Sequence, residues 1–416
     1  MGAGEDLAEK RAMSAAATTL KRDATVISLV GVAHLTSHLF QFVLPPIFPL
    51  LREEFQVSYS ALGLVVAAFY GASGVGQALV GVFVDRHGGK PVLLAGLALL
   101  SGAVGAMAFA PSYWTLLPLA LIAGLGNSVF HPADFSILTH SVSERWHGRA
   151  FSIHAFSGTL GYALSPVLLS TIAYATNWRI ALSAAAAWGL AITLAVLVSG
   201  RLLEGRPAPA KSGDGLVMVP GFLKLLRMPV MFLAFFYLTL IALAATGLQT
   251  YAAAALTTIY AVPYTVATGA ISAYLIGNAA GILAGGPLAD MTRRHEAIAM
   301  LGLFGGAALM SIVAMGGYDF ALVLAAMAAA GLSVGTTTPA RDMLVKSAAP
   351  RGATGKTFGL VYSGFDIGSM IAPLILGWLV DHGLAQGFLL ALAAVWLVTI
   401  ATIGQFTQRI PARAGT

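Results

Sequence analysis

The residues best suited to chemistry are ionisable side chains that interrupt long apolar stretches of the chain. His34 and His38 are four residues apart, and His131 and Asp134 are three apart. Each pair would therefore share one face of a helix. Imidazole changes its charge between about pH 5 and pH 8, which suits the uptake and release of protons. We predict that these four residues line a site for a substrate or for protons.

The same side chains are also compatible with a metal ion, because Zn²⁺ accepts histidine and carboxylate ligands. Two of these histidines lie on one helix, however, and the chain has no cysteine. We therefore expect no metal and no other cofactor, with a proton gradient as the energy source. A lone histidine in such a stretch is often only a hydrogen-bond donor between helices, and for His154 both interpretations stay open.

A second ionisable group lies in the C-terminal half and consists of Arg341, Asp342, Tyr362 and Asp366. Asp366 has Tyr362 four residues before it on the same helical face. A lone carboxyl group there would suit a proton carrier, because burial disfavours its charged form. The alternative is a structural, hydrogen-bonded aspartate. Asp342 follows Arg341 directly, which turns its side chain by about 100° on a helix, so we expect it to have a different partner.

The composition places these residues in a membrane. Of the 416 residues, 58% are hydrophobic and 10% are charged, whereas soluble domains carry about 25% charged residues. Mean hydropathy is +0.83. This excludes a cytosolic enzyme, a nucleic-acid binder and a disulfide scaffold. No phosphate-binding loop, nucleotide fingerprint or catalytic triad is visible, so we do not expect an enzyme.

The apolar stretches predict an all-α membrane protein with twelve transmembrane helices, because a bilayer core of about 30 Å needs roughly 20 apolar residues per helix. The segments are apolar on all sides and do not alternate as barrel strands do. They lie near residues 25–51, 60–84, 91–110, 114–142, 149–174, 178–199, 229–255, 265–289, 297–316, 319–347, 355–380 and 386–407.

The segments divide the chain into two bundles of six helices, at 25–199 and 229–407. The linker 200–228 joins them. We expect residues 1–24 to form a tail that is disordered or lies on the membrane surface, and residues 408–416 to form a second tail. The first helix would serve as an uncleaved signal anchor, because residues 1–24 have no apolar core of a signal peptide.

The basic residues predict the orientation. All but three of the 23 lysines and arginines fall in loops, tails or helix ends on one side. Arg52 and Arg179 would lie on the other side, and Arg341 lies inside a helix. By the positive-inside rule, both termini are cytoplasmic in a bacterial-type inner membrane. The same bias explains the net charge of +6 without nucleic acid.

The two halves also form an internal repeat. Pro132, Gly161 and Pro166 recur as Pro339, Gly368 and Pro373 at a constant shift of 207 residues. Two parallel repeats imply a pseudo-twofold axis along the membrane normal, with the substrate site near mid-depth between the halves. Asp134 aligns with Arg341, so we predict that the two approach each other when the inner side closes. The alternative is a static ion pair.

The loop after the second predicted helix resembles a signature of the major facilitator superfamily. It reads Gly81-Val82-Phe83-Val84-Asp85-Arg86-His87-Gly88-Gly89-Lys90. The resemblance implies two pseudo-twofold bundles of six helices and an inner gate, whose residues here are Gly81, Asp85, Arg86, Gly88 and Lys90. A second, less complete copy keeps Asp290. The alternative is that these charges only set the topology.

Two further stretches resemble the fosmidomycin-resistance group of that superfamily. They are His34-x-x-x-His38 with the following Pro49 to Phe55, and Gly126-Asn127-Ser128-Val129-Phe130-His131-Pro132. The resemblance implies proton-coupled efflux of a small, often anionic, solute by a monomer in the lipid bilayer. Where the group has Glu-Ser-Ser-Arg, this chain has Ala133-Asp134-Phe135-Ser136, which leaves the substrate open. Uptake of an organic anion such as a carboxylate is the alternative, and a non-transporting receptor or scaffold is more distant.

Overall fold

The computed structural model describes residues 2–203, 226–292, 294–348 and 354–409, and these residues are helical with short connections and no strand. Twelve helical spans among them are long and apolar enough to cross a membrane. The predicted all-α membrane fold is confirmed, and the chain is an integral, multi-pass membrane protein.

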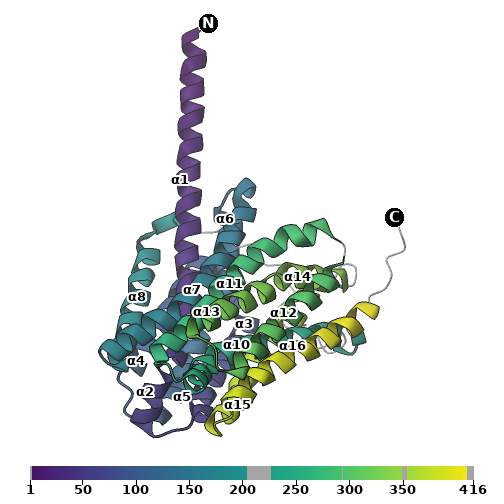
Figure 1. Ribbon diagram of the computed structural model, residues 1–416. Coiled ribbons are helices and arrows are strands. Elements are labelled where there is room, and N and C mark those ends of the chain that lie inside the picture. The colour runs from purple at the N-terminus through teal and green to yellow at the C-terminus, as the bar shows by residue number, and fades with distance from the viewer. Residues whose placement is uncertain (1, 204–225, 293, 349–353, 410–416) are drawn as a thin grey trace.

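The helices fall into two groups that follow the chain (Figure 1). The first contains α1 Gly2–Gln41, η1 Pro45–Ile47, α2 Phe48–Phe55, α3 Tyr59–His87, α4 Gly89–Met107, α5 Tyr113–Asn127, α6 Phe130–Ser141, η2 Glu144–Trp146, α7 His147–Ala175, α8 Trp178–Val198 and η3 Gly200–Leu203. The second contains α10 Pro229–Tyr260, α11 Tyr264–Met291, α12 His295–Met315, α13 Phe320–Gly335, α14 Thr337–Ala348, α15 Thr354–Asp381 and α16 Ala385–Gln408.

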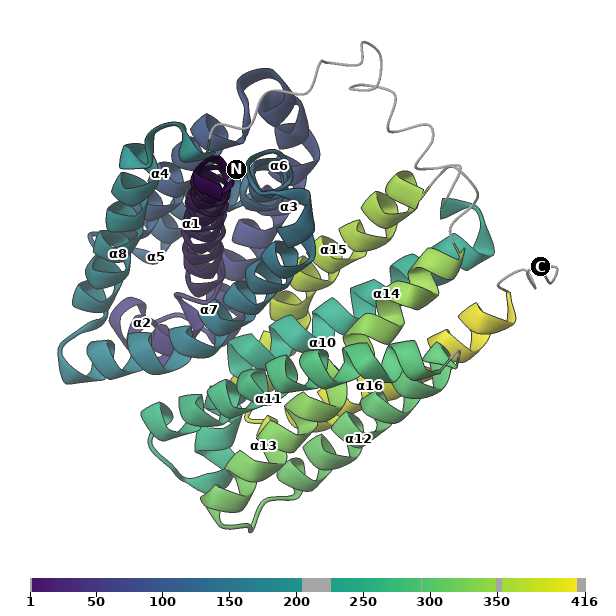
Figure 2. The ribbon, with the colours of Figure 1, turned by 90° about the horizontal axis from the view of Figure 1, so that it is seen from above.

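The two groups lie side by side as an N-terminal and a C-terminal half (Figure 2). Their main contacts join α3 to α15 and α7 to α11, and η1 also packs against α10. We call the end where α8 and α16 finish and α10 begins the terminal end, since both chain termini lie toward it. The end that carries η1 and α2 is the opposite end.

Prolines divide three of the predicted helices. The predicted segment 25–51 is not one helix, because α1 ends at Gln41 and η1 begins at Pro45. Pro45 and Pro46 have no N–H to continue the helical hydrogen bonds. The segments 114–142 and 319–347 are each split into two helices, before Pro132 and Pro339. These matching breaks agree with the internal repeat.

The N-terminal residues differ from the prediction. Instead of a disordered or surface-lying tail, residues 2–24 continue α1, which projects beyond the bundle at the terminal end (Figure 1). Seven of these 23 residues are alanine, and the glutamate, lysine, arginine and leucine residues among them also favour a helix intrinsically. Most of the predicted linker 200–228 lies outside the described residues.

Glycines bring neighbouring helices into backbone contact. On α11, a Cβ atom at Gly277 would lie 2.0 Å from the carbonyl oxygen of Ala328 on α13, and one at Gly281 would lie 2.2 Å from that of Leu332. Close approach of this kind replaces hydrophobic driving force in lipid, where helix association depends on packing.

We expect Gly277→Ala to lower the free energy of unfolding by about 1–3 kcal/mol, because the added methyl group would push α11 from α13. Gly269→Ala on the same helix is the matched control, since nothing lies within 4 Å of a Cβ there. Its removal of a helical glycine should be neutral or stabilise by roughly 0.5–1 kcal/mol. Thermal unfolding of the purified variants in detergent measures both, and equal stability of the two would contradict the packing described.

Candidate functional site

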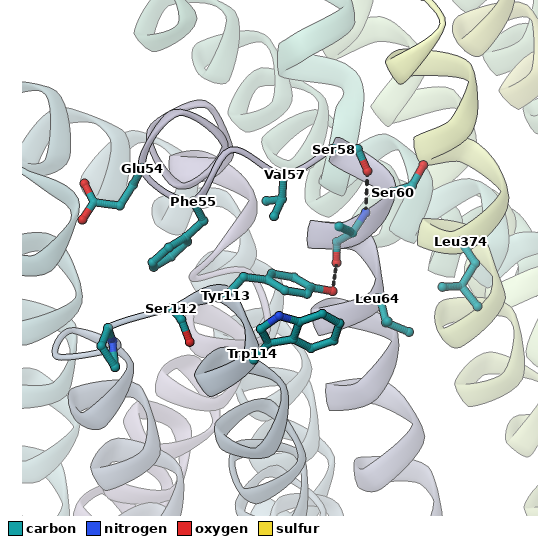
Figure 3. Close-up of a pocket in the computed structure, with 12 residues that line it drawn as sticks. Glu54, Phe55, Val57, Ser58, Ser60, Leu64, Ser112, Tyr113, Trp114 and Leu374 are labelled. Atoms are coloured by element: carbon teal, nitrogen blue, oxygen red, sulfur yellow. Dashed lines mark hydrogen bonds between the residues drawn. The ribbon is translucent and has the colours of Figure 1, made fainter.

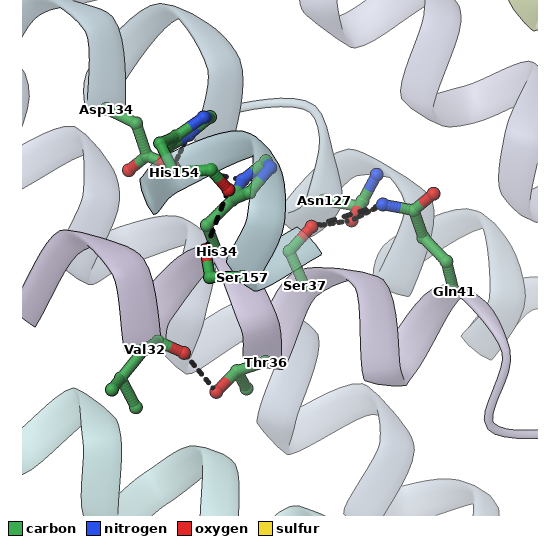
Figure 4. A network of polar contacts seen from close by, with 9 residues as sticks. All are labelled: Val32, His34, Thr36, Ser37, Gln41, Asn127, Asp134, His154 and Ser157. Carbon is green, nitrogen blue, oxygen red and sulfur yellow. Dashed lines mark hydrogen bonds and ion pairs between the residues drawn. The ribbon is translucent and has the colours of Figure 1, made fainter. Parts of the chain in front are cut away.

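A buried carboxylate and two histidines meet where α1, α6 and α7 pack together (Figure 4). Asp134 Oδ2 accepts a hydrogen bond from Nε2 of His154 at 3.0 Å, and it lies 3.3 Å from Nδ1 of His34. The exposed fractions of Asp134, His34 and His154 are 0%, 3% and 4%. A buried charge needs such partners, because removing it from water is costly.

Two more histidines complete this group, which we call the histidine cluster: His34, His38, His131, His154 and Asp134. The ring of His34 stacks on that of His154, with centroids 3.6 Å apart. Its centroid lies 4.5 Å from that of His38 and 5.1 Å from that of His131. His131 is exposed, whereas the ring of His38 is half-buried. The structure thus brings all four predicted residues together and adds His154, for which the sequence left two interpretations open.

Two glycines of α7 make room for these rings. A Cβ atom at Gly158 would lie 2.9 Å from Nε2 of His34 and 2.8 Å from Cε1 of His38. One at Gly161 would lie 2.3 Å from the carbonyl oxygen of Leu35. These glycines therefore set the depth at which α1 packs against α7, and with it the position of the imidazoles.

An uncharged hydrogen-bond network continues from the histidine cluster toward the opposite end (Figure 4). Asn127 Oδ1 accepts from Ser37 Oγ at 2.7 Å and from Gln41 Nε2 at 3.3 Å, and its Nδ2 donates to Ser73 Oγ at 2.9 Å. Tyr162 donates to Gln41 Oε1. The network joins α1, α3, α5 and α7. The sequence analysis did not assign these residues a role, although Asn127 stood in one of the motifs.

The aligned pair Asp134 and Arg341 is not in contact in this state. Asp134 faces the histidines within the N-terminal half instead of the other half. Arg341 Nε donates to Asp342 Oδ1 at 2.9 Å, and its guanidinium lies over the ring of Phe365, 5.3 Å from the centroid. Asp342 thus pairs with its neighbour Arg341, for which the sequence predicted no such contact. The contact between Asp134 and Arg341 was predicted for a state closed at the terminal end, and it stays a prediction.

Asp366 lies at the contact between the halves. A Cβ atom at Gly74 of α3 would be 2.8 Å from Cβ of Asp366 on α15. Tyr70 and Tyr162 are within its electrostatic reach. Among the described residues no ion pair or hydrogen bond involves its carboxylate. The side chain of Tyr362, predicted to share its face, lies outside the described residues.

At the opposite end, Asp381 of α15 binds the first turn of α3. Its Oδ1 accepts from the N–H of Tyr59 at 2.6 Å, and its Oδ2 accepts from the N–H and the Oγ of Ser60 at 2.8 and 2.6 Å. Helix N-termini leave such N–H groups without partners and carry a partial positive charge. This carboxylate therefore closes one half against the other.

Further side chains join the halves toward the same end. The hydroxyl of Tyr251 on α10 lies 2.8 Å from the carbonyl oxygen of Pro373 and 3.1 Å from that of Tyr59. Others link α11 to the N-terminal half: Tyr264 donates to Pro45 O at 2.7 Å, Ser272 to Ala163 O at 2.7 Å, and Ser170 and Thr268 share a bond of 3.1 Å. The two halves are closed here.

The loop predicted as an inner gate lies at the terminal end between α3 and α4. Gly88 has φ of 83°, a conformation that residues with a Cβ rarely adopt. Arg86 is exposed and Lys90 is buried. Gly81 has no atom within 4 Å of a built Cβ. The side chains of Asp85 and Asp290 lie outside the described residues, so the gate stays a prediction.

A cleft of about 810 Å³ opens at the opposite end between α2, α3 and α5, with Leu374 of α15 at its edge (Figure 3). Its acidic residue, Glu54, is bound to Arg179 at 2.9 Å. None of the predicted site residues lines it. We therefore place the candidate site at the histidine cluster and the contact between the halves.

Comparison with known proteins decides the family. The model of the Major Facilitator Superfamily matches residues 30–264 and 238–413. The chain belongs to this superfamily. Its fold is that of a solved nucleoside transporter, NupG, with a TM-score of 0.77 over 93% of this chain and 99% of that chain, at 14% identity.

The curated relatives of this chain match it over only part of their own length. The fosmidomycin resistance protein of Escherichia coli is 31% identical over 160 residues, which is 38% of this chain and 39% of that protein. A probable sulfoacetate transporter of Cupriavidus necator is 34% identical over 149 residues, 35% of this chain and 34% of that protein. The chain thus matches about two fifths or less of each.

We expect Asp381→Ala to open the opposite end, because it removes the acceptors that α15 offers to Tyr59 and Ser60, and with them charge-assisted hydrogen bonds worth about 1.5–3 kcal/mol each. Spin labels on Ser112→Cys and Gly387→Cys, one in each half, report the separation; the parent chain has no cysteine. Longer distances should become populated.

Asp319→Ala is the matched control, because Asp319 accepts from the N–H of Ala321 within the C-terminal half at 2.8 Å. Its distance distribution should equal that of the parent chain. An unchanged distribution in the Asp381 variant would show that other contacts hold the halves closed.

Proposed function

We propose that this protein is a proton-coupled secondary transporter that moves a small organic anion by alternating access. Of the two directions, we propose efflux. The observation that carries the proposal is the position of Asp366 at a contact between two halves, which hydrogen bonds, ring contacts and glycine-mediated contacts close at one end. Such contacts break and re-form at modest cost, because each net hydrogen bond is worth about 0.5–1.5 kcal/mol.

The orientation supports a state open to the cytoplasm. The basic residues gather at the terminal end, which the positive-inside rule assigns to the cytoplasm. The closed, opposite end would then face outward. Arg52 and Arg179 lie at that end in α2 and α8. In a bacterium, the membrane would be the inner membrane.

Coupling requires a titratable group whose surroundings change between the two states. Asp366 meets this condition, because rocking of the halves separates α15 from Gly74 and admits water. A carboxyl group binds a proton more readily in a buried seam than in water. Asp134 does not meet it in the same way, since its partners His34 and His154 belong to its own half and would move with it.

An anionic substrate is favoured by Arg341. Arg341 is 9% exposed, and its partner Asp342 is partly exposed, so a substrate anion can compete with Asp342 for the guanidinium. The names of two relatives, a fosmidomycin resistance protein and a probable sulfoacetate transporter, support small anions. They also leave uptake of an organic anion as the second candidate function.

A deletion strain can distinguish export from import. A deletion strain that loses resistance to a toxic anion indicates export, whereas a strain that loses growth on an anionic carbon source indicates import. Failure of the purified protein to move any solute into liposomes under a pH gradient would favour a receptor or scaffold. Two relatives, an MFS-type transporter of Bacillus subtilis and the probable sulfoacetate transporter, are transporters by name, which favours transport over catalysis.

In liposomes with an imposed pH gradient, we expect Asp366→Asn to lower concentrative movement of fosmidomycin or sulfoacetate at least tenfold, because the amide cannot carry a proton. Exchange of labelled for unlabelled solute without a gradient should persist. Arg341→Gln should lower both concentrative movement and exchange, since it removes the cation that binds the anionic substrate. Asp319→Asn is the control and should leave both unchanged. Parental concentrative transport in Asp366→Asn would exclude Asp366 as the coupling group.

A further inference from the structure

The histidine cluster contains more coordinating groups than a structural hydrogen-bond contact needs. Nδ1 of His34, Nδ1 of His38 and Oδ1 of Asp134 are buried without a hydrogen-bond partner in the described part of the chain. Buried polar atoms are normally paired, and unpaired ones need an explanation such as an unseen ion. These three atoms belong to one group of touching side chains.

Three imidazoles of the cluster present donor atoms to a common point. One ring nitrogen from each of His34, His131 and His154 lies within 4.8 Å of the other two. The three residues come from α1, α6 and α7, one from each helix. We expected no metal from the sequence because two of the histidines share a helix and the chain has no cysteine. These three ligands come from different helices, which removes the first objection.

Asp134 supplies a fourth donor at a suitable distance. Its Oδ2 lies 3.0 Å from Nε2 of His154 and 3.3 Å from Nδ1 of His34. Four-coordinate zinc with bonds of about 2.0–2.1 Å has ligand atoms about 3.3 Å apart. Two edges of such a tetrahedron are therefore already formed, and a modest rotation of the exposed His131 would complete it.

The charges of the cluster also favour a cation. Protonation of several of these imidazoles at once is opposed, because like charges a few ångströms apart repel one another strongly when they are shielded from water. Neutral imidazoles keep a free lone pair, and one divalent ion bound to three of them and to the carboxylate serves four donors at once. His131 is exposed and gives the ion an entry path.

We propose that His34, His131, His154 and Asp134 form a binding site for one divalent transition-metal ion of the Zn²⁺ class, which joins α1, α6 and α7. Small soft-to-borderline ions suit imidazole with carboxylate ligands, whereas Mg²⁺ and Ca²⁺ require oxygen ligands. Since binding is measured without a substrate or a gradient, its outcome is independent of the proposed transport function.

The test is equilibrium dialysis of the full chain, purified in detergent and stripped with a chelator, against Zn²⁺, with metal content measured by mass spectrometry. We expect one ion per chain, and at least a tenfold loss of affinity in His154→Gln and in His131→Ala. His140→Gln is the matched control, because His140 lies on α6 and is exposed, with its Nδ1 2.7 Å from the carbonyl oxygen of Ser136. It should bind as the parent chain does.

A second readout identifies the ligands. Co²⁺ should give the visible absorption of a four-coordinate site, and His131→Cys should keep the ion while adding a thiolate-to-metal band. A purely structural role of His131 would not produce that band. Should His154→Gln fail to fold, His131→Ala still decides, because His131 is exposed. Unchanged Zn²⁺ stoichiometry and affinity in the cluster variants, or equal loss in His140→Gln, would overturn the proposal and leave hydrogen bonding as the role of the cluster.

Discussion

The contact between α3 and α15 is the constraint on which the described state depends. Along it, glycines take the place of side chains: a Cβ at Gly63 would lie 2.7 Å from the carbonyl oxygen of Pro373, and one at Gly377 would lie 3.0 Å from Cα of Ser60. In lipid there is little hydrophobic gain in joining two apolar helices. Backbone proximity, with Asp381 bound to one helix N-terminus, supplies the attraction instead.

Asp134 and Arg341, two buried charges, are each compensated within their own half. Asp134 is bound by His154 beside His34, and Arg341 is bound by Asp342. Because these partners move together, the halves can rotate without exposing a lone buried charge, which would cost several kcal/mol. Asp366 differs, since its neighbour Gly74 belongs to the other half. The energetic cost of changing state therefore concentrates at the surface where the halves meet.

The fold was predictable because its signals are local. Hydropathy along about 20 residues identifies a span whatever its neighbours are, and a proline interrupts its own helix. The grouping of His34 with His38 likewise follows from a spacing of four on one helix. The family motif at Gly81 to Lys90 gave the architecture independently of any contact.

The direction of Asp134 was not predictable, because it depends on how α6 is rotated after the break from α5. One residue turns a helix by about 100°, so an uncertainty of one residue in the break moves a side chain from one seam to another. The role of Asp381 could not be predicted from the sequence either, because its partners are backbone N–H groups, which every sequence has. His154 needed the packing of α7 on α1, which Gly158 and Gly161 permit.

The paired breaks between α5 and α6, and between α13 and α14, have a mechanical consequence. The short segments beyond them carry His131 and Asp134 in one half and Arg341 and Asp342 in the other. Each half therefore carries these ionisable residues on a short helix that is not continuous with the rest of its span, so their position is set by how that short helix packs on its neighbours.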